Sequence, residues 1–229
     1  MTDWDKTDII HFLSDLHGYQ SYLELCTPTT GALYHKIDRS KFTTCHRLMY
    51  RCSPSFDDQM DVNFRSSHMG TEDLFETIHA FELRYDIALV DSFHLYDASY
   101  RDLADAFSVM TDRGTVVVHD CLPPSEDLVS AEFVPGSWCG VSFLAFIDFV
   151  QNTPGLVYTT VDTDYGCGVI RKSGTEQASR GVDDLKEGWA SVRHDAKAAY
   201  RFMIENKAPL LNLSSIDEFR RVELNRPRT

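Results

Sequence analysis

The 229-residue sequence lacks any apolar run long enough to cross a membrane, and it is poor in positive charge. It contains 22 Lys and Arg against 35 Asp and Glu, so its formal net charge is −13 at pH 7. Such an acidic chain repels phosphate backbones, and we expect neither a nucleic-acid partner nor a membrane partner. The first residues, MTDWDKTD, are unlike a secretory signal or a basic transit peptide, so they favour a cytoplasmic location.

Paired cysteines of the zinc-binding or redox kind are also missing. No CxxC spacing occurs among Cys26, Cys45, Cys52, Cys121, Cys139 and Cys167. A disulfide framework is typical of much smaller secreted domains, so it is not expected here. We therefore predict reduced thiols, several of them buried as small apolar side chains.

What the sequence does contain is enough apolar material for a packed protein. Hydrophobic residues make up 43 % of the chain and aromatic residues 12 %, as in globular domains. A chain of this length is sufficient for one sizeable domain with an extension.

Strand-like and helix-like segments alternate from residue 20 to residue 171. Apolar and β-branched segments predict strands at 21–26, 42–50, 61–66, 85–91 and 115–120. Apolar residues at helical spacing predict helices at 30–38, 72–83, 96–110 and 140–150. Continuous apolar strands separated by helices are typical of a parallel sheet that is covered on both faces.

Two more strands are predicted at 156–162 and 167–172. Only TDYG separates them, which is too short for a parallel crossover, so they should form an antiparallel hairpin. The expected fold class is therefore α/β: a Rossmann-like doubly wound sheet in residues 1–172, mostly parallel with an antiparallel C-terminal hairpin.

Residues 173–229 are predicted to be a linker and a helical C-terminal extension. Glycine and serine are frequent at 173–181, and a long amphipathic helix is expected at 182–206, ended by Pro209. Ser215 and Glu218 have the spacing of a capping box that begins a short final helix. The long helix could pack on the domain or form the contact of a homodimer.

Polar residues follow the fourth and fifth predicted strands. Asp91 ends the run IALV, with His94 three residues later, and His119 and Asp120 end the run VVV. In an open parallel sheet, ligands bind beyond the carboxyl ends of the strands, where the strand order reverses. A buried strand has no structural need for such an ending, so we predict that these residues line a ligand cleft.

These strand ends resemble those of the class I S-adenosylmethionine-dependent methyltransferases. In small-molecule branches of that family the fourth strand ends (I/V)DxxHxY and the fifth ends (V/L)HD; here they read LVDSFHLY at 89–96 and RGTVVVHDC at 113–121. The resemblance covers residues 20–172. It implies an enzyme that transfers a methyl group from S-adenosylmethionine to a hydroxyl or amine of a small polar metabolite, such as a sugar or a natural-product intermediate.

The resemblance also implies where the cofactor binds. The segment YLELCTPTTG at 22–31 occupies the place of the family's first motif, an acidic residue followed by Gly-x-Gly, although Gly31 is the only glycine in it. The second predicted strand lacks the acidic residue expected at its end. The residues expected to contact the cofactor are Glu24, Cys26, Thr27, Gly31, Ser66 and Asp91.

Some members of these branches use a divalent metal such as Mg²⁺ or Mn²⁺. By position its ligands would be Asp91, His119 and Asp120, and it would lower the pKa of a substrate hydroxyl before methyl transfer. The residues expected to be catalytic are His94, His119 and Asp120, because imidazole titrates near neutral pH and can act as a general base. Trp138 could form a wall of the substrate cleft or belong to the core.

Two other functions remain open at this point. One is a metal-dependent enzyme on the same scaffold that no longer uses S-adenosylmethionine, with the same metal ligands. The other is a non-catalytic binding module that acts through the C-terminal helix, which the missing glycines would favour.

Overall fold

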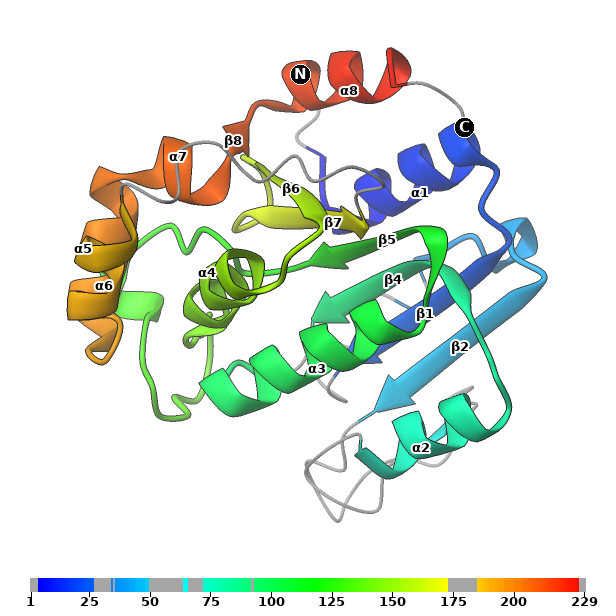
Figure 1. The fold of residues 1–229 in the computed structure, drawn as a ribbon, viewed down its shortest axis with the longest axis horizontal. Coiled ribbons are helices and arrows are strands. Elements are labelled where there is room, and N and C mark those ends of the chain that lie inside the picture. Colours follow the sequence, from blue (N-terminus) through cyan, green and yellow to red (C-terminus); the bar gives the residue numbers. More distant parts are fainter. Residues whose placement is uncertain are drawn as a thin grey trace.

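A computed structural model describes residues 4–26, 34, 36–49, 64–65, 72–91, 93–172 and 185–226. The described strands form an eight-stranded sheet in the order β3-β2-β1-β4-β5-β7-β6-β8 (Figure 1). The strands are β1 (Ser21–Cys26), β2 (Thr44–Met49), β3 (Phe64–Arg65), β4 (Tyr85–Asp91), β5 (Met110–Val118), β6 (Leu156–Val161), β7 (Cys167–Lys172) and β8 (Leu213–Ser214).

The helices precede, separate and follow these strands. They are α1 (Lys6–His17), α2 (Glu72–Ala80), α3 (Tyr96–Ser108), α4 (Ser142–Asn152), α5 (Lys186–Val192), α6 (Ala196–Glu205), α7 (Lys207–Leu211) and α8 (Ile216–Leu224). Short 3-10 turns lie at η1 (Arg39–Lys41) and η2 (Glu126–Leu128). Among the described residues no helix is both long and apolar enough to cross a membrane.

The predicted fold class is confirmed. Strands β3, β2, β1, β4 and β5 are parallel, and β7 is antiparallel to both β5 and β6. Strand β8 adds a short parallel pair to β6 at the edge. The strand order reverses between β1 and β4, which makes the carboxyl ends of these strands the expected ligand-binding edge.

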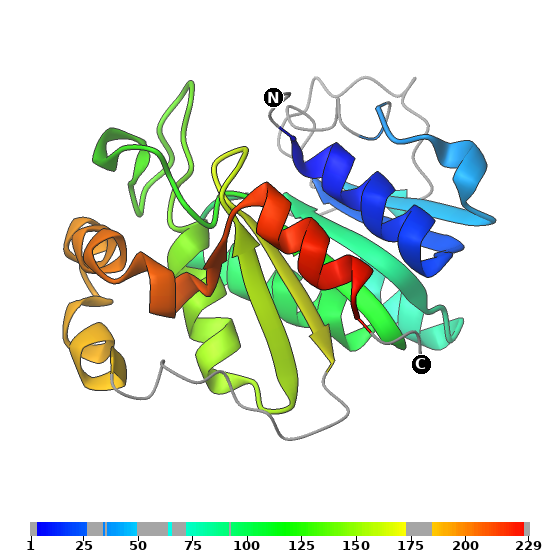
Figure 2. The same cartoon turned by 90° about the horizontal axis from the view of Figure 1, so that it is seen from above.

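Both faces of the sheet are covered by helices, which explains why its strands are apolar throughout. Helices α2, α3 and α4 lie on one face, and α1 and α8 lie on the other (Figures 1 and 2). Side chains alternate between the two faces: Val116 and Val118 pack in the first core, and Val117 packs in the second.

Helix α1 is an element that the sequence analysis did not predict. The side chain of Asp5 accepts hydrogen bonds from the backbone N–H groups of Thr7 and Asp8, and the side chain of Asp8 accepts one from the backbone N–H of Asp5. Gly18 ends the helix in a left-handed conformation, with φ 68°. The capping pattern was therefore present in the sequence, upstream of the segment where the alternation of strands and helices begins.

Three predicted boundaries are wrong. Residues 36–38, in the predicted helix 30–38, form a turn because the Asp38 side chain caps η1 instead. The helix predicted at 96–110 ends at Ser108. The strand predicted at 115–120 begins at Met110 and ends at Val118, so β5 includes the TDRG segment at 111–114. Gly114 permits this close packing, since a Cβ there would lie 3.0 Å from the Tyr85 carbonyl oxygen.

The long C-terminal helix is in fact two helices. The chain breaks between α5 and α6, where the side chain of Asp195 accepts hydrogen bonds from Lys197 and Ala198 and so starts a new helix. Pro209 lies in the first turn of α7 and does not end a helix; a proline there costs no intrahelical hydrogen bond. The Ser215 cap of α8 is confirmed by its hydrogen bond from the Glu218 backbone.

Candidate active site

The polar residues predicted to line a cleft lie together at the carboxyl ends of β4 and β5. Asp91 is the last residue of β4, and His119 follows β5, with its backbone N–H donating to the Val90 carbonyl at 3.0 Å. Asp120 has φ 58°, a left-handed conformation that is uncommon outside glycine. Asp91, His119 and Asp120 are all buried, at 4 %, 8 % and 4 % exposure, so their interactions with one another are strong.

His94 joins the two carboxylates. Its Nε2 lies 3.5 Å from Asp91 Oδ1 and 3.2 Å from Asp120 Oδ2. Its Nδ1 lies 2.7 Å from the Trp138 carbonyl oxygen, which can only accept, so Nδ1 carries a proton. Burial by itself lowers the pKa of His94, but Asp91 and Asp120 outweigh that effect and raise it.

His119 lies between the same carboxylates and a lysine. Its Nδ1 is 3.5 Å from Asp91 Oδ1 and 3.4 Å from Asp120 Oδ2. Its Nε2 is 3.0 Å from Lys6 Nζ, so one of these two nitrogens donates and the other accepts. Burial by itself lowers the pKa of the His119 imidazole, but Asp91, Asp120 and Asp164 raise it well above its ordinary value.

Lys6 and Asp164 are site residues that the sequence analysis missed. Lys6 Nζ lies 3.2 Å from Asp91 Oδ2 and 3.7 Å from Asp164 Oδ2, and the Lys6 backbone N–H donates to Asp164 at 3.0 Å. Burial lowers the pKa of Lys6, but Asp91 and Asp164 raise it above its ordinary value, so it stays charged. Burial would raise the pKa of Asp164, but His119 and Lys6 lower it to about 2.

The missed residues differ in how much the sequence could have indicated them. Lys6 directly follows the Asp5 cap of α1 and would have been considered had that helix been predicted. Asp164 lies in the β6–β7 turn, and no local pattern indicates that this turn reaches the ends of β4 and β5.

The donor set suits a divalent cation. Asp91, His94 and Asp120 each offer one ligand atom, and these atoms all lie within 4.8 Å of one another. Two carboxylates and one imidazole fit Mn²⁺, Fe²⁺ or Zn²⁺ better than Mg²⁺. The structure thus places His94 in this group, while His119, the residue expected from the sequence, also contacts Lys6. A cavity of about 10 Å³ adjoins Asp91, His94 and His119, roughly the space of one water molecule.

The residues predicted to hold the cofactor are only partly within the described chain. Thr27, Gly31 and Ser66 lie outside the described residues. Cys26 ends β1 and pairs in register with Asp91, so it lies at the strand-order reversal, where a nucleotide cofactor would bind in this fold.

Glu24 is enclosed by neighbouring side chains. It is fully buried, accepts a hydrogen bond from the Tyr22 hydroxyl at 2.8 Å, and lies 3.8 Å from Arg47 Nε. Burial raises the pKa of Glu24, and the opposing effects of Tyr22 and Arg47 leave it at about 7. Cys26 and Asp91 are therefore the described residues that lie at the edge predicted for the cofactor, whereas Glu24 contacts Tyr22 and Arg47.

Aromatic rings form one side of the site. Trp138 lies 5.5 Å from His94, 5.7 Å from Phe93 and 5.3 Å from Phe133, measured between ring centroids. Phe133 is 59 % exposed, so this cluster reaches the surface. Trp138 is therefore half-buried in a loop beside His94, and its role as a wall of the substrate cleft stays a prediction.

Solved structures share this architecture. A Staphylococcus aureus protein named as a candidate caffeoyl-CoA O-methyltransferase aligns with a TM-score of 0.51 and 13 % identity, over 76 % of this chain and 85 % of that one. This is a methyltransferase fold. The resemblance to class I S-adenosylmethionine-dependent methyltransferases is confirmed at the level of the fold.

Two other structures with the methyltransferase fold are similar, both with S-adenosylhomocysteine bound. A Bacillus cereus O-methyltransferase has a TM-score of 0.49 and 13 % identity, covering 73 % of this chain and 80 % of that one. A Podospora anserina methyltransferase has a TM-score of 0.47 and 14 % identity, covering 73 % and 78 %. No family model and no curated protein matches the sequence.

Proposed function

We propose that this protein transfers a methyl group from S-adenosylmethionine to a hydroxyl or amine of a small polar metabolite, such as a sugar or a natural-product intermediate. The observation that carries the proposal is the meeting of Asp91, His94, His119 and Asp120 at the carboxyl ends of β4 and β5, in a methyltransferase fold. The strand-order reversal between β1 and β4 supports a cofactor at the same edge.

The proposed reaction asks little of the protein besides alignment and uptake of a proton. Methyl transfer from a sulfonium is an in-line displacement, so the acceptor must be held against the methyl group. The aromatic cluster of Phe93, Phe133 and Trp138 offers flat apolar faces for a sugar ring or a planar metabolite. His94, 5.5 Å from the Trp138 ring, lies beside it and would take up the acceptor's proton when no metal is bound, with Asp91 and Asp120 stabilising the imidazolium. His119 is the alternative base, although its Nε2 already contacts Lys6.

A divalent metal is part of the proposal. Asp91 and Asp120 would hold it, with His94 as the third ligand and His119 as the alternative that the sequence suggests. Such an ion would polarise the acceptor oxygen and favour its deprotonation. Asp91, Cys26 and the segment that contains Thr27 and Gly31 would contact the cofactor, and Ser66 would border it.

Calorimetric titration with S-adenosylhomocysteine, with and without Mn²⁺, tests the proposal. We expect micromolar binding, about −8 kcal/mol, weakened at least tenfold by Asp91→Asn. Asp112→Asn is the matched control, because Asp112 lies in β5 with a fully exposed side chain far from the strand end. Absence of binding by the folded protein under every metal condition would overturn the methyltransferase function. If the protein binds Mn²⁺ stoichiometrically but no S-adenosylhomocysteine, the metal-dependent alternative is favoured. If it binds neither, a non-catalytic binding module is favoured.

The cellular setting is a further part of the proposal. A small-molecule substrate, a cytoplasmic location and no nucleic-acid partner belong to the proposal, and the acidic net charge supports the last of these. A homodimer remains a prediction that light scattering of the purified protein would test.

A further inference from the structure

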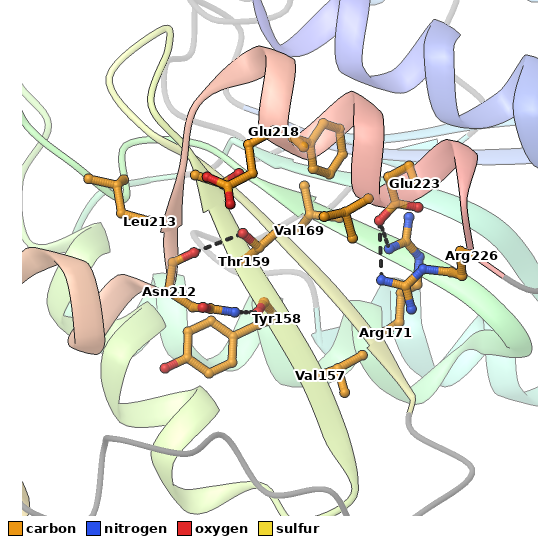
Figure 3. A pocket seen from close by; sticks show the side chains of 13 residues that line it. Val157, Tyr158, Thr159, Val169, Arg171, Asn212, Leu213, Glu218, Glu223 and Arg226 are labelled. Atoms are coloured by element: carbon orange, nitrogen blue, oxygen red, sulfur yellow. Dashed lines mark hydrogen bonds and ion pairs between the residues drawn. The ribbon is translucent and has the colours of Figure 1, made fainter.

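A second cavity lies between α8 and the β6–β7 hairpin, apart from the candidate active site (Figure 3). Its volume is about 250 Å³, and residues of β6, β7, β8 and α8 line it. None of the polar residues at the ends of β4 and β5 borders it. It is on the sheet face that α1 and α8 cover (Figure 2).

Two arginines stand at one end of this cavity and share one carboxylate. Glu223 Oε1 accepts from Arg171 Nη1 at 2.8 Å and from Arg226 Nη2 at 3.2 Å. Arg171 is 8 % exposed and donates through Nε to the Thr115 hydroxyl at 2.8 Å. The position of the Arg171 guanidinium is therefore fixed from two sides.

Each arginine retains a buried donor without a partner. Among the residues that the structure describes, Arg171 Nη2 and Arg226 Nε have no hydrogen-bond acceptor, although both atoms are shielded from solvent. Leaving a buried donor of a charged group unpaired is costly, so an acceptor at this end of the cavity would stabilise the protein.

The cationic end has an excess of positive charge. Burial would raise the pKa of Glu223, but His17, Arg171 and Arg226 lower it to about 2, so Glu223 is ionised and neutralises one arginine. Arg171 and Arg226 thus share Glu223 as a carboxylate partner, and no other ion pair of either guanidinium occurs among the residues that the structure describes. A guanidinium presents parallel N–H groups that match the two oxygens of a carboxylate.

The remainder of the cavity is lined by apolar side chains, by hydrogen-bonded polar groups and by Glu218, whose carboxylate is 54 % exposed and lies 3.7 Å from Arg221 Nη2. Val157, Val169 and Val222 supply apolar walls. At the far end the Thr159 hydroxyl donates to the Asn212 backbone carbonyl at 2.8 Å, and the Asn212 side-chain amide donates to the Tyr158 backbone carbonyl at 2.6 Å (Figure 3). The cavity is smaller than the roughly 300–1,000 Å³ of most ligand pockets, which favours a compact metabolite over a nucleotide.

We propose that this cavity binds a small amphipathic carboxylate. The carboxylate lies against the guanidinium groups of Arg171 and Arg226, which line the cavity, and a short apolar chain packs against Val157, Val169 and Val222. The site is independent of the methyl-transfer site, so the inference holds whether or not that function does.

Titration of the purified full-length protein with sodium hexanoate, followed by NMR, tests the proposal. We expect saturable 1:1 binding in about the millimolar range, as for a ligand of this size. Hexanol, which has the same chain without the charge, should bind at least tenfold more weakly. Arg226→Gln should weaken hexanoate binding at least tenfold, since it removes one of the two donors.

Two further variants distinguish binding in the cavity from binding to surface charge. Val157→Phe narrows the cavity without altering charge and should also abolish hexanoate binding. Lys207→Gln should leave it unchanged, because Lys207 is an exposed cation of α7 that does not border the cavity. Absence of saturation in the wild type, equal affinity in Val157→Phe, or binding of inorganic phosphate in place of hexanoate would overturn the proposal. Folding of each variant is checked by circular dichroism, and Val157→Phe keeps the test decisive if Arg226→Gln does not fold.

Discussion

Lys6 brings an ammonium group into the candidate active site, next to its carboxylates and His119. Its ammonium lies within 4 Å of His119, Asp91 and Asp164, and the side chain is 10 % exposed. Asp91 is buried and Asp164 is partly buried, and Lys6 supplies both carboxylates with a cation that stays charged. Burial alone raises the pKa of Asp91, but His119, His94 and Lys6 bring it well below the ordinary value.

Replacing Lys6 by methionine should destabilise the protein and free the carboxylates for a metal. Removing one partner of a buried ion pair leaves the other charge uncompensated, and we expect a loss of about 3 kcal/mol in the free energy of unfolding. Urea unfolding at pH 7 measures this loss. Lys36→Met is the control, because Lys36 is 59 % exposed, lies 3.9 Å from Asp5, and should change stability by under about 0.5 kcal/mol. Lys6→Met should also bind Mn²⁺ more tightly than the wild type, and weaker binding would contradict the role assigned to Lys6.

Glu24 makes stability depend on pH in the opposite direction from an ordinary salt-bridged carboxylate. Its pKa is raised from 4.5 to about 7 in the folded protein, first by burial. Between these values the folded protein holds a proton that the unfolded chain releases. This contribution to stability is therefore complete below pH 4.5 and is lost as the pH rises through 7.

Urea unfolding of Glu24→Gln at pH 5 and pH 8 tests this effect. A shift of this size corresponds to up to about 3 kcal/mol. The wild type should lose more stability than the variant between the two pH values, because glutamine cannot titrate. Glu76→Gln, on the exposed side of α2, should follow the wild type. Parallel pH profiles for wild type and Glu24→Gln would show that Glu24 does not titrate in this range.

At the scale of elements, the loop before α4 holds the aromatic side of the site in place. Gly140 has φ 58°, and a Cβ there would lie 2.1 Å from the His94 carbonyl oxygen. That carbonyl accepts the Val141 N–H at 2.9 Å, so the loop is attached to the segment that carries His94. Only glycine permits this approach.

Gly140→Ala should therefore lower the free energy of unfolding by more than the left-handed backbone conformation alone explains. Gly155 has a similar φ of 70° with nothing within 4 Å of the position of a Cβ, so Gly155→Ala measures the conformational cost by itself. We expect the free energy of unfolding to fall by about 1 kcal/mol in Gly155→Ala and by at least about 2 kcal/mol more in Gly140→Ala. Chemical denaturation of both variants gives the difference, and equal losses would mean that the loop moves away without cost.

At the scale of the whole molecule, the C-terminal residues complete the core of the sheet domain. Leu213 and Ser214 of β8 pair with β6, and the Trp189 indole donates to Asp148 of α4 at 2.7 Å. Phe219 of α8 is 1 % exposed and packs in the same core as α1. The division at residue 172 into a domain and an extension remains a prediction, and these contacts indicate that the two fold together.

Truncation after residue 172 tests this expectation. Each large buried side chain lost from α5–α8 is worth about 2–5 kcal/mol, and together they exceed the stability of about 5–15 kcal/mol typical of a whole domain. We expect the truncated chain to give no cooperative thermal transition. Truncation after residue 226 should melt like the full chain, because every described contact is kept. A cooperative transition in the shorter chain would establish residues 1–172 as an independent domain.

Local patterns account for much of what could be predicted. The bounds of the strands at 21–26, 85–91 and 167–172 agree with β1, β4 and β7, because apolar runs and short turns are properties of neighbouring residues. The same locality accounts for the errors. The predicted helix at 182–206 has continuous helical spacing, yet the capping side chain of Asp195 divides it.

The sequence by itself determined the alternation of strands and helices, the final hairpin and the cluster of Asp91, His94, His119 and Asp120 at adjacent strand ends. Each of these follows from periodicity, turn length and the rule that parallel strands end at one edge. Only the tertiary structure decided that Lys6 reaches His119 from 113 residues away and that the β6–β7 turn brings Asp164 to both. It also decided that Arg171 and Arg226 face one cavity. Contacts of this kind depend on how α1, α8 and the hairpin pack on the sheet, and no local pattern carries that information.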